Sequence, residues 1–102
     1  NGMTERNEQF LTALSNRILY LCKIHGISPE KVTEKIHNRR GQEINPESLM
    51  DIHTDEIYKI AEMLGVEADF LLNKPSSYTA EVEYIVYLLK RKDISVPTHI
   101  DI

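Results

Sequence analysis

The chain has 102 residues, of which 41% are hydrophobic and 27% are charged, and its formal net charge is −4. This size and apolar content are typical of one compact domain with a modest core, and the acidic balance argues against a generic nucleic-acid binder. No apolar run approaches the roughly 20 residues of a membrane span, and no signal-peptide pattern opens the chain. The single cysteine, Cys22, excludes an internal disulfide. We therefore expect a cytoplasmic protein without a membrane segment.

Two helices are predicted at the start of the chain. Apolar residues at three- and four-residue steps indicate a helix over residues 5–25, which a glycine ends. Ser28 then suits the N-cap of a short helix over residues 28–37, and the proline after it suits the first helical position. Val32 and Ile36 lie four residues apart, so both are expected to face the core.

The middle of the chain begins with a loop. The stretch HNRRGQEI, residues 37–44, has no periodicity and contains a glycine typical of a turn. A third helix is expected to open at Asn45, where a cap residue again precedes proline, and to run to Ile52. A fourth helix beginning at Thr54 comes immediately after it, and residues 66–73 predict one or two further helical turns.

The C-terminal part is set off by a linker. KPSSY, residues 74–78, places proline and paired serines between two periodic segments. Thr79 is expected to cap a last helix running to about Lys92, with acids early and bases late, as the helix dipole favours. The tail beyond it alternates apolar with polar or proline residues, which is the period of a strand. We therefore divide the chain into a domain over 1–74 and a C-terminal helix and tail over 75–102.

The charges are distributed unevenly along the chain. Residues 17–40 hold six bases and two acids, which gives 6 − 2 = +4, and residues 41–72 hold one base and eight acids, which gives 1 − 8 = −7. Such a division favours a positive face for a polyanion. A solvated surface with chance segregation of charge explains the same numbers.

Two blocks of sequence carry a family resemblance. RILYLCKIHGISPEKVTEKI, residues 17–36, resembles the first two helices of the Cro/repressor family (XRE-type, lambda-repressor-like) of helix-turn-helix proteins. IYKIAEMLGVEADFLL, residues 57–72, is similar to the family's fourth and fifth helices. The resemblance implies an all-α, five-helix helix-turn-helix domain, here with an extra C-terminal helix and a short strand-like tail. In that fold the third helix lies in the major groove of DNA.

This sequence departs from the family pattern where DNA would lie. The loop HNRRGQEI is longer than the usual connection between the second and third helices, and the connection to the fourth helix is almost absent. Thr33 stands where the family has a small alanine, which predicts looser packing of the second helix on the third. Two acids, Glu47 and Asp51, fall on the predicted third helix and would repel phosphates.

The resemblance implies a sequence-specific transcriptional regulator that binds operator DNA as a homodimer, without a cofactor. Arg39 and Arg40 would anchor the protein, because arginine binds guanine or phosphate with paired hydrogen bonds. The alternative for both arginines is a solvated turn without a partner. The remaining predicted contacts come from Ser28, Lys31, Lys35, Asn38, Gln42, Asn45, Glu47 and Ser48. Among these, the lysines would contact the DNA backbone, and Gln42, Asn45, Glu47 and Ser48 would read bases.

The last helix is expected to pair two chains. Its positions 82, 85, 86 and 89 form one apolar face that can pack on the domain, and a second apolar surface would then be exposed in a monomer. The residues expected to dimerise are Tyr84, Tyr87, Leu88, Ile94 and Val96. The alternative is a helix that lies flat on its own domain.

A second function is compatible with the same sequence. The acidic segment 43–69 favours a protein-interaction module, antitoxin- or antirepressor-like, that has kept the fold and lost DNA binding. The four histidines lack metal-ligand spacing, and the serines lack a nucleophile turn or a spaced His and Asp set. We therefore expect neither a bound metal nor an enzyme.

Overall fold

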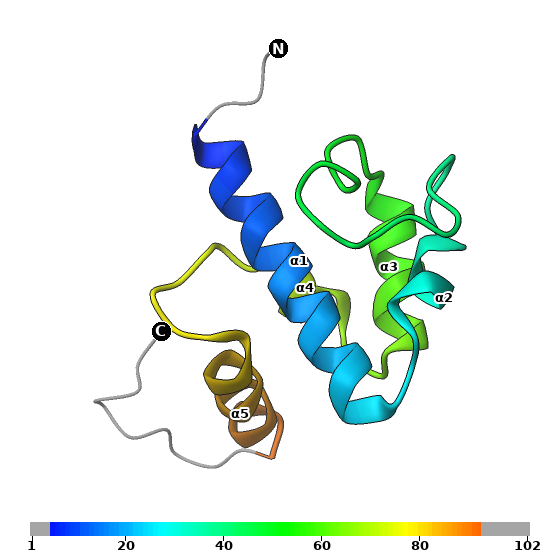
Figure 1. Cartoon of the computed structure of the whole chain (residues 1–102). Coiled ribbons are helices and arrows are strands. Elements are labelled where there is room, and N and C mark those ends of the chain that lie inside the picture. The colour runs from blue at the N-terminus through cyan, green and yellow to red at the C-terminus, as the bar shows by residue number, and fades with distance from the viewer. Residues whose placement is uncertain (1–4, 93–102) are drawn as a thin grey trace.

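The computed structural model describes residues 5–92, and every regular element in that range is an α-helix (Figure 1). The helices are α1 (Glu5–His25), α2 (Pro29–Thr33), α3 (Thr54–Met63), α4 (Ala68–Leu72) and α5 (Ala80–Arg91). The predicted all-α class is confirmed. No helix in the described range is both long and apolar enough to cross a membrane. The predicted strand-like tail lies outside the described residues.

The predicted third helix is wrong, because residues 45–51 form a run of turns instead. One backbone bond, from the Leu49 amide to the Asn45 carbonyl, has α-helical spacing, and the next two along the chain span only three residues. The run of turns ends before His53, which is extended, with φ −92° and ψ 152°, as the N-cap of α3. The described range therefore holds five helices including α5, one fewer than we predicted.

The second helix begins as predicted but ends four residues earlier. Ser28 is its N-cap and accepts a hydrogen bond from the Glu30 amide. Thr33 ends it, because its hydroxyl donates to the Glu30 carbonyl and accepts from the Gly41 amide at 2.8 Å. Thr33 is fully buried, and its bond to the Gly41 amide fastens the loop to α2. Its expected effect on the packing of the second helix against a third one stays a prediction, because no helix forms over residues 45–51.

The core lies on one long face of α1. In Figure 1 this helix runs through the middle of the molecule, with α2 and α3 on one side and α5 on the other. The first block of the core comes from α1, the second from the α2 region and the turns after it, and the third from α3 and α4. The buried residues of the whole core are Leu11, Leu14, Ile18, Leu21, Cys22, Val32, Ile36, Ile44, Leu49, Ile57, Ile60, Ala61, Leu64, Val66, Phe70 and Leu71.

The last helix has the predicted cap but not the predicted orientation. Thr79 accepts a hydrogen bond from the Val82 amide, and the helix ends at Arg91. Tyr84 and Tyr87 pack against the core, with their ring centroids 5.8 and 5.3 Å from that of Phe70. Ile85, which we expected to face the domain, is instead 46% exposed.

The aromatic face of α5 is thus used within the chain. The expectation that Tyr84 and Tyr87 are left exposed for a second chain is wrong. Their rings fill the space between α4 and α5, and the Tyr87 hydroxyl accepts a hydrogen bond from the Glu67 amide at 2.9 Å. Ile94 and Val96, the other residues expected to dimerise, lie outside the described residues, while Leu88 is half-buried.

A buried ion pair fastens α5 to α1. The Arg17 guanidinium donates to both carboxylate oxygens of Glu83, at 2.8 and 2.9 Å. Its remaining hydrogen bonds go to the carbonyls of residues 71, 73 and 74, so it also holds the end of α4. Ser76 donates to Glu83 at 2.6 Å. We call Arg17, Glu83 and Ser76 the ion-pair cluster.

Candidate nucleic-acid interface

The turn over residues 45–51 occupies the place of the predicted third helix and is held by its own side chains. The Asn45 side-chain oxygen accepts from the Ser48 amide at 2.9 Å, and the Ser48 hydroxyl accepts from the Asn45 amide at 3.1 Å. This reciprocal pair resembles a capping box, in which two side chains satisfy the free amides at a helix start. The side-chain hydrogen bonds typical of a helix start are therefore present, but no helix follows them.

The same bonds remove two predicted base-reading residues from the surface. Ser48 is buried, and its hydroxyl also donates to the Asn45 carbonyl. The expectation that Ser48 faces solvent is wrong, because its hydroxyl points back to the backbone of Asn45, three residues earlier. Asn45 is half-buried and its side-chain oxygen is already bonded. Both side chains are thus bonded within the chain.

Arg39 is bonded within the protein. Its guanidinium donates to the Ser48 carbonyl at 3.0 Å, to the Asn38 carbonyl at 3.1 Å and to the Asp51 carboxylate at 2.8 Å. Gln42 also donates to the Asn38 carbonyl, at 3.3 Å. Only 19% of the Arg39 side chain is exposed. This arginine therefore fastens the loop to the turn and uses three of its five N–H donors within the chain.

Arg40 lies beside α2 and is exposed. The bond from the Gly41 amide to the Thr33 hydroxyl brings the loop back against this helix, one residue from Arg40. Lys31 on α2 and Lys35 in the turn that directly follows it are both exposed. None of these three cations forms an ion pair with a residue in the range 5–92. We call Lys31, Lys35 and Arg40 the basic flank.

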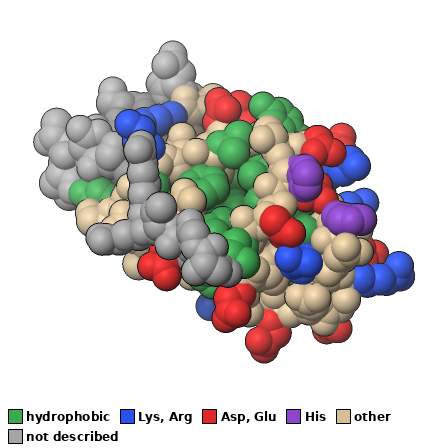
Figure 2. Space-filling model, turned by 90° about the horizontal axis from the view of Figure 1, so that it is seen from above, with side chains coloured by type: hydrophobic (Ala, Val, Ile, Leu, Met, Phe, Trp, Pro, Cys, Tyr) green, Lys and Arg blue, Asp and Glu red, His purple; other side chains and the backbone are tan. Residues whose placement is uncertain are grey.

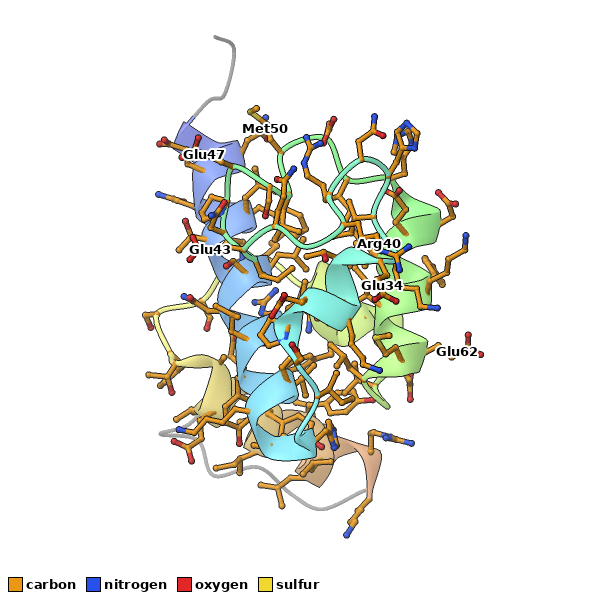
Figure 3. The ribbon with its side chains drawn as sticks, turned by 45° about the vertical axis from the view of Figure 1, so that its right-hand side comes forward. Glu34, Arg40, Glu43, Glu47, Met50 and Glu62 are labelled. Carbon is orange, nitrogen blue, oxygen red and sulfur yellow. The ribbon has the colours of Figure 1, made fainter. Side chains whose placement is uncertain are left out.

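A second group of exposed residues lies away from the basic flank. In Figure 3, Glu43, Glu47 and Met50 lie on the α1 side of the loop, apart from Arg40, with Glu47 and Met50 nearer the amino-terminal end of α1 than Glu43 is. Glu43 and Glu47 are exposed, and Met50 is 44% exposed. Glu47, the predicted base reader, thus stands with another acid rather than with the arginine. We call these three residues the acidic patch.

The surface around the loop carries both signs of charge. Among residues 17–40, Arg17 is neutralised by Glu83 and Arg39 by Asp51, which leaves four bases and two acids, or 4 − 2 = +2. Figure 2 shows acidic and basic side chains interspersed over the loop-bearing end of the molecule. The strong positive face expected from the sequence is reduced to a small basic flank.

Two residues that position the site were not predicted from the sequence. The Glu56 carboxylate accepts from the His37 amide at 2.7 Å and from the His53 amide at 2.8 Å. Glu56 thus holds the start of the loop and the residue just before α3. The spacing of His53 and Glu56 is that of a capping box and could have indicated half of this role. No sequence signal connects Glu56 with His37. Likewise, we counted Arg17 as a surface charge, and nothing in the sequence pairs it with Glu83.

The cysteine and the acidic and histidine side chains within residues 5–92 are candidates for a reactive or metal-binding arrangement. The cysteine is buried in the core, and this burial raises the pKa of the Cys22 thiol, so it is a poor nucleophile at neutral pH. No group of His, Cys, Asp or Glu within residues 5–92 has the geometry of a metal site. Comparison with known proteins found no matching family model, no matching curated protein and no matching solved structure.

Proposed function

We propose that the protein is a DNA-binding regulator of the helix-turn-helix kind, whose basic flank contacts the phosphate backbone. The observation that supports this most directly is the set of three exposed cations, Lys31, Lys35 and Arg40, without an intramolecular ion pair among the described residues. They lie on α2 and the loop that returns to it, next to a capped turn in the place of a third helix. Elsewhere near the loop, the cationic side chain of Arg39 is already bonded.

The arrangement of elements also favours this function. α2, the turn over 45–51, α3 and α4 succeed one another in the order that the family resemblance implies, and all contribute to one core with α1. In helix-turn-helix proteins such a core sets the angle at which the exposed segment meets DNA. Asn45 and Ser48 are less exposed than Gln42 and Glu47, so base reading is assigned to the latter two, of which Gln42 also donates to the Asn38 carbonyl. Gln can bind adenine, and Glu can accept from cytosine.

The size of the basic flank limits the affinity. Three phosphate contacts correspond to a slope of log K against log salt of about −3, since each contact contributes about −0.9 on duplex DNA. Nonspecific binding of this kind is weak, with Kd in the range of about 10⁻⁴ to 10⁻⁶ M at physiological salt. The acidic patch adds repulsion wherever it approaches a phosphate, so a useful affinity requires specific base contacts or a second copy of the domain.

The test compares single alanine variants over a series of salt concentrations. Bound sequences are first selected from a random DNA pool, and affinity for the best sequence is then measured for the protein and for Lys31→Ala, Lys35→Ala and Arg40→Ala. Each variant is expected to weaken binding and to reduce the salt slope by about 1. Lys59→Ala is the matched control, because Lys59 is exposed on α3 and has no ion pair among the described residues. If no sequence is enriched, or if all four variants behave alike, the proposal is wrong.

A second function is favoured by the acidic patch. An exposed methionine beside two carboxylates suits a protein partner with an apolar pocket and basic rim, since methionine adapts to irregular contact surfaces. This would make the chain a protein-interaction module, antitoxin- or antirepressor-like. Failure of the selection from random DNA, together with a captured partner whose binding is lost in Met50→Lys, would support this function instead. Retained partner binding in that variant would contradict it.

A further inference from the structure

A cavity of about 900 Å³ lies between α4, the linker over residues 73–78 and one side of α5. In Figure 1 this linker, drawn in yellow, leaves α4, loops outward and returns to the start of α5. The apolar part of the cavity lining includes Phe70, Val86 and Tyr87. Binding sites for small molecules have volumes of about 300–1,000 Å³ and combine such apolar side chains with a few polar groups. We call this space the α4–α5 cavity.

The cavity is preformed, because the ion-pair cluster holds the linker in place. Arg17 has five N–H donors, and all five are bonded within the chain. Two donate to the Glu83 carboxylate, and three donate to the carbonyls of residues 71, 73 and 74. The linker backbone is thus fixed to a buried side chain, so a ligand does not have to order it on binding. The same bonds leave no donor of Arg17 for a ligand.

The lining of the α4–α5 cavity is basic, although the protein is acidic. Its described residues include four bases and three acids, which gives 4 − 3 = +1, whereas the whole chain carries −4. A cavity of about 780 Å³ beside α1 has two acids and no base among its described lining residues, so its charge does not favour an anion. A net charge of +1 matches a ligand with a single negative charge. The bases of the α4–α5 cavity are Arg17, Lys74, Lys90 and Arg91, and its acids are Glu67, Asp69 and Glu83.

Two of these bases have no ionic partner among residues 5–92. Lys74 and Lys90 are exposed, and neither forms an ion pair with an acid in that range. The guanidinium of Arg91, in contrast, lies 3.6 Å from the Glu67 carboxylate and 5.4 Å from the centroid of the Tyr87 ring. Lys74 comes from the linker and Lys90 from α5, so the two unpaired ammonium groups belong to different walls of the cavity.

We propose that the α4–α5 cavity binds a small organic monoanion in which an apolar ring or branched chain carries one carboxylate. The apolar group lies against Phe70 and Tyr87, since burial of apolar surface and contact with aromatic rings favour binding. The carboxylate lies near Lys74 and Lys90, whose ammonium groups are compact charges with three donors each. A second negative charge is disfavoured, because Asp69 belongs to the same lining and like charges repel.

The inference does not depend on DNA binding, because the basic flank contributes no residue to the described lining of the cavity. The cavity is built on the ion-pair cluster and α5, so it exists only in the folded chain. A bound ligand should therefore stabilise the fold. The lysines at its rim are exposed to water and salt, so we expect a dissociation constant no tighter than the micromolar range.

Isothermal titration calorimetry of the full chain with two matched probes tests the charge of the ligand. The probes 1-naphthaleneacetate and 1-naphthaleneacetamide share one ring system and differ in the negative charge. We expect the carboxylate to bind at least tenfold more tightly than the amide, to raise the melting temperature, and to lose affinity as salt rises. Equal affinities for the two probes, or no binding of either at millimolar concentration, would overturn the proposal.

Substitutions in the lining test which charges hold the carboxylate. Lys74→Met and Lys90→Met each keep a long side chain without its charge, and each should weaken binding of the carboxylate severalfold while leaving the amide unchanged. Asp69→Asn should tighten binding of the carboxylate, because it removes a like charge. Lys59→Met is the matched control, since Lys59 is exposed on α3 and outside the lining. Equal effects of the three lysine substitutions, or weaker binding in Asp69→Asn, would contradict the assigned site.

Nuclear magnetic resonance with the carboxylate probe locates the apolar group. The side-chain signals of Phe70, Val86 and Tyr87 are expected to shift, because the ring of the ligand lies beside them. Tyr58 is the internal control, since it is 55% exposed on α3 and lies outside the cavity lining. Shifts at Tyr58 as large as those at Tyr87 would show nonspecific contact with exposed rings and would refute binding in the cavity.

Discussion

Two of the three arginine–carboxylate pairs among residues 5–92 have the same shortest contact distance and differ in their surroundings. Arg17 and Glu83 lie in the ion-pair cluster, where 2% and 9% of their side chains are exposed. Arg39 and Asp51 join the loop to the turn, where the corresponding values are 19% and 68%. In both pairs the shortest contact is 2.8 Å. Equal distances therefore accompany very different solvation.

The difference teaches where the chain can be modified without loss of the fold. Removing one member of a buried pair leaves the other charge uncompensated, which lowers the free energy of unfolding by about 3–5 kcal/mol. An exposed pair contributes only about 0–1 kcal/mol to that free energy. The ion-pair cluster thus makes α5 part of the folded unit. The exposed pair of Arg39 and Asp51 contributes little to stability, so the loop region can be changed with little loss of the fold.

The largest expected effect comes from Glu83→Gln, which removes the charge that balances Arg17. We expect the free energy of unfolding in urea to fall by about 3 kcal/mol or more, a large part of the total of about 5–15 kcal/mol for a domain. The matched control is Glu67→Gln, because Glu67 also pairs with an arginine beside α5 but is 62% exposed at 3.6 Å. The control should lose less than about 1 kcal/mol. Equal losses would show that burial does not distinguish the two pairs.

Glu83→Gln should also change how the stability of the protein depends on pH. Burial alone would raise the pKa of Glu83, but the hydrogen bonds from Arg17 and Ser76 and the charge of Arg17 outweigh it, so the pKa lies below its ordinary value of 4.5. A carboxyl whose pKa is lowered by folding adds stability that is complete above the unfolded pKa and is lost as pH falls through the folded pKa. The protein should therefore lose stability below about pH 4.5, and Glu83→Gln should show a shallower loss. Parallel pH profiles would contradict this.

An intermediate effect is expected from Ser76→Ala, which tests how the ion-pair cluster is held together. The Ser76 hydroxyl donates to Glu83 at 2.6 Å, and hydrogen bonds to charged groups contribute about 1.5–3 kcal/mol. Its loss should also let the pKa of Glu83 rise toward the ordinary value, so the stability lost on acidification is smaller and the loss is complete at a higher pH. Ser77→Ala is the control, because Ser77 is exposed and adjacent. Unfolding measured at several pH values should separate the two variants.

The regular part of the fold could be predicted because its determinants are local. The spacing of apolar residues gave the extent of α1 and α3, and the caps Ser28 and Thr79 gave the starts of α2 and α5. Each of these signals lies within a few residues of the feature it predicts. The prediction for residues 45–51 failed for the opposite reason. Asn45 makes the side-chain bond typical of a helix start, but the residues after it form turns, and the next helix begins at Thr54.

The candidate site could be predicted only as a list of residues, because their roles depend on distant partners. Arg39 and Arg40 are adjacent and chemically identical, yet one is bonded to Asp51 and the other is exposed. The pairing of Arg17 with Glu83 spans 66 positions and has no periodic signal. Charge counts from the sequence therefore overestimated the positive face, since they could not remove cations that the fold neutralises.

The smallest expected effect is that of Asp51→Asn, and it gives the comparison its lower limit. The carboxylate is 68% exposed, so its pair with Arg39 is screened by water and salt, and we expect a loss of less than about 1 kcal/mol that shrinks further in 1 M salt. If the basic flank binds DNA, this variant should bind more tightly, because it removes a negative charge and frees one donor of Arg39 for a phosphate. Tighter binding with little change in the urea midpoint would show that the pair of Arg39 and Asp51 affects DNA binding more than it affects stability. A loss comparable to that of Glu83→Gln would mean instead that the Arg39 contacts hold the fold as firmly as the ion-pair cluster does.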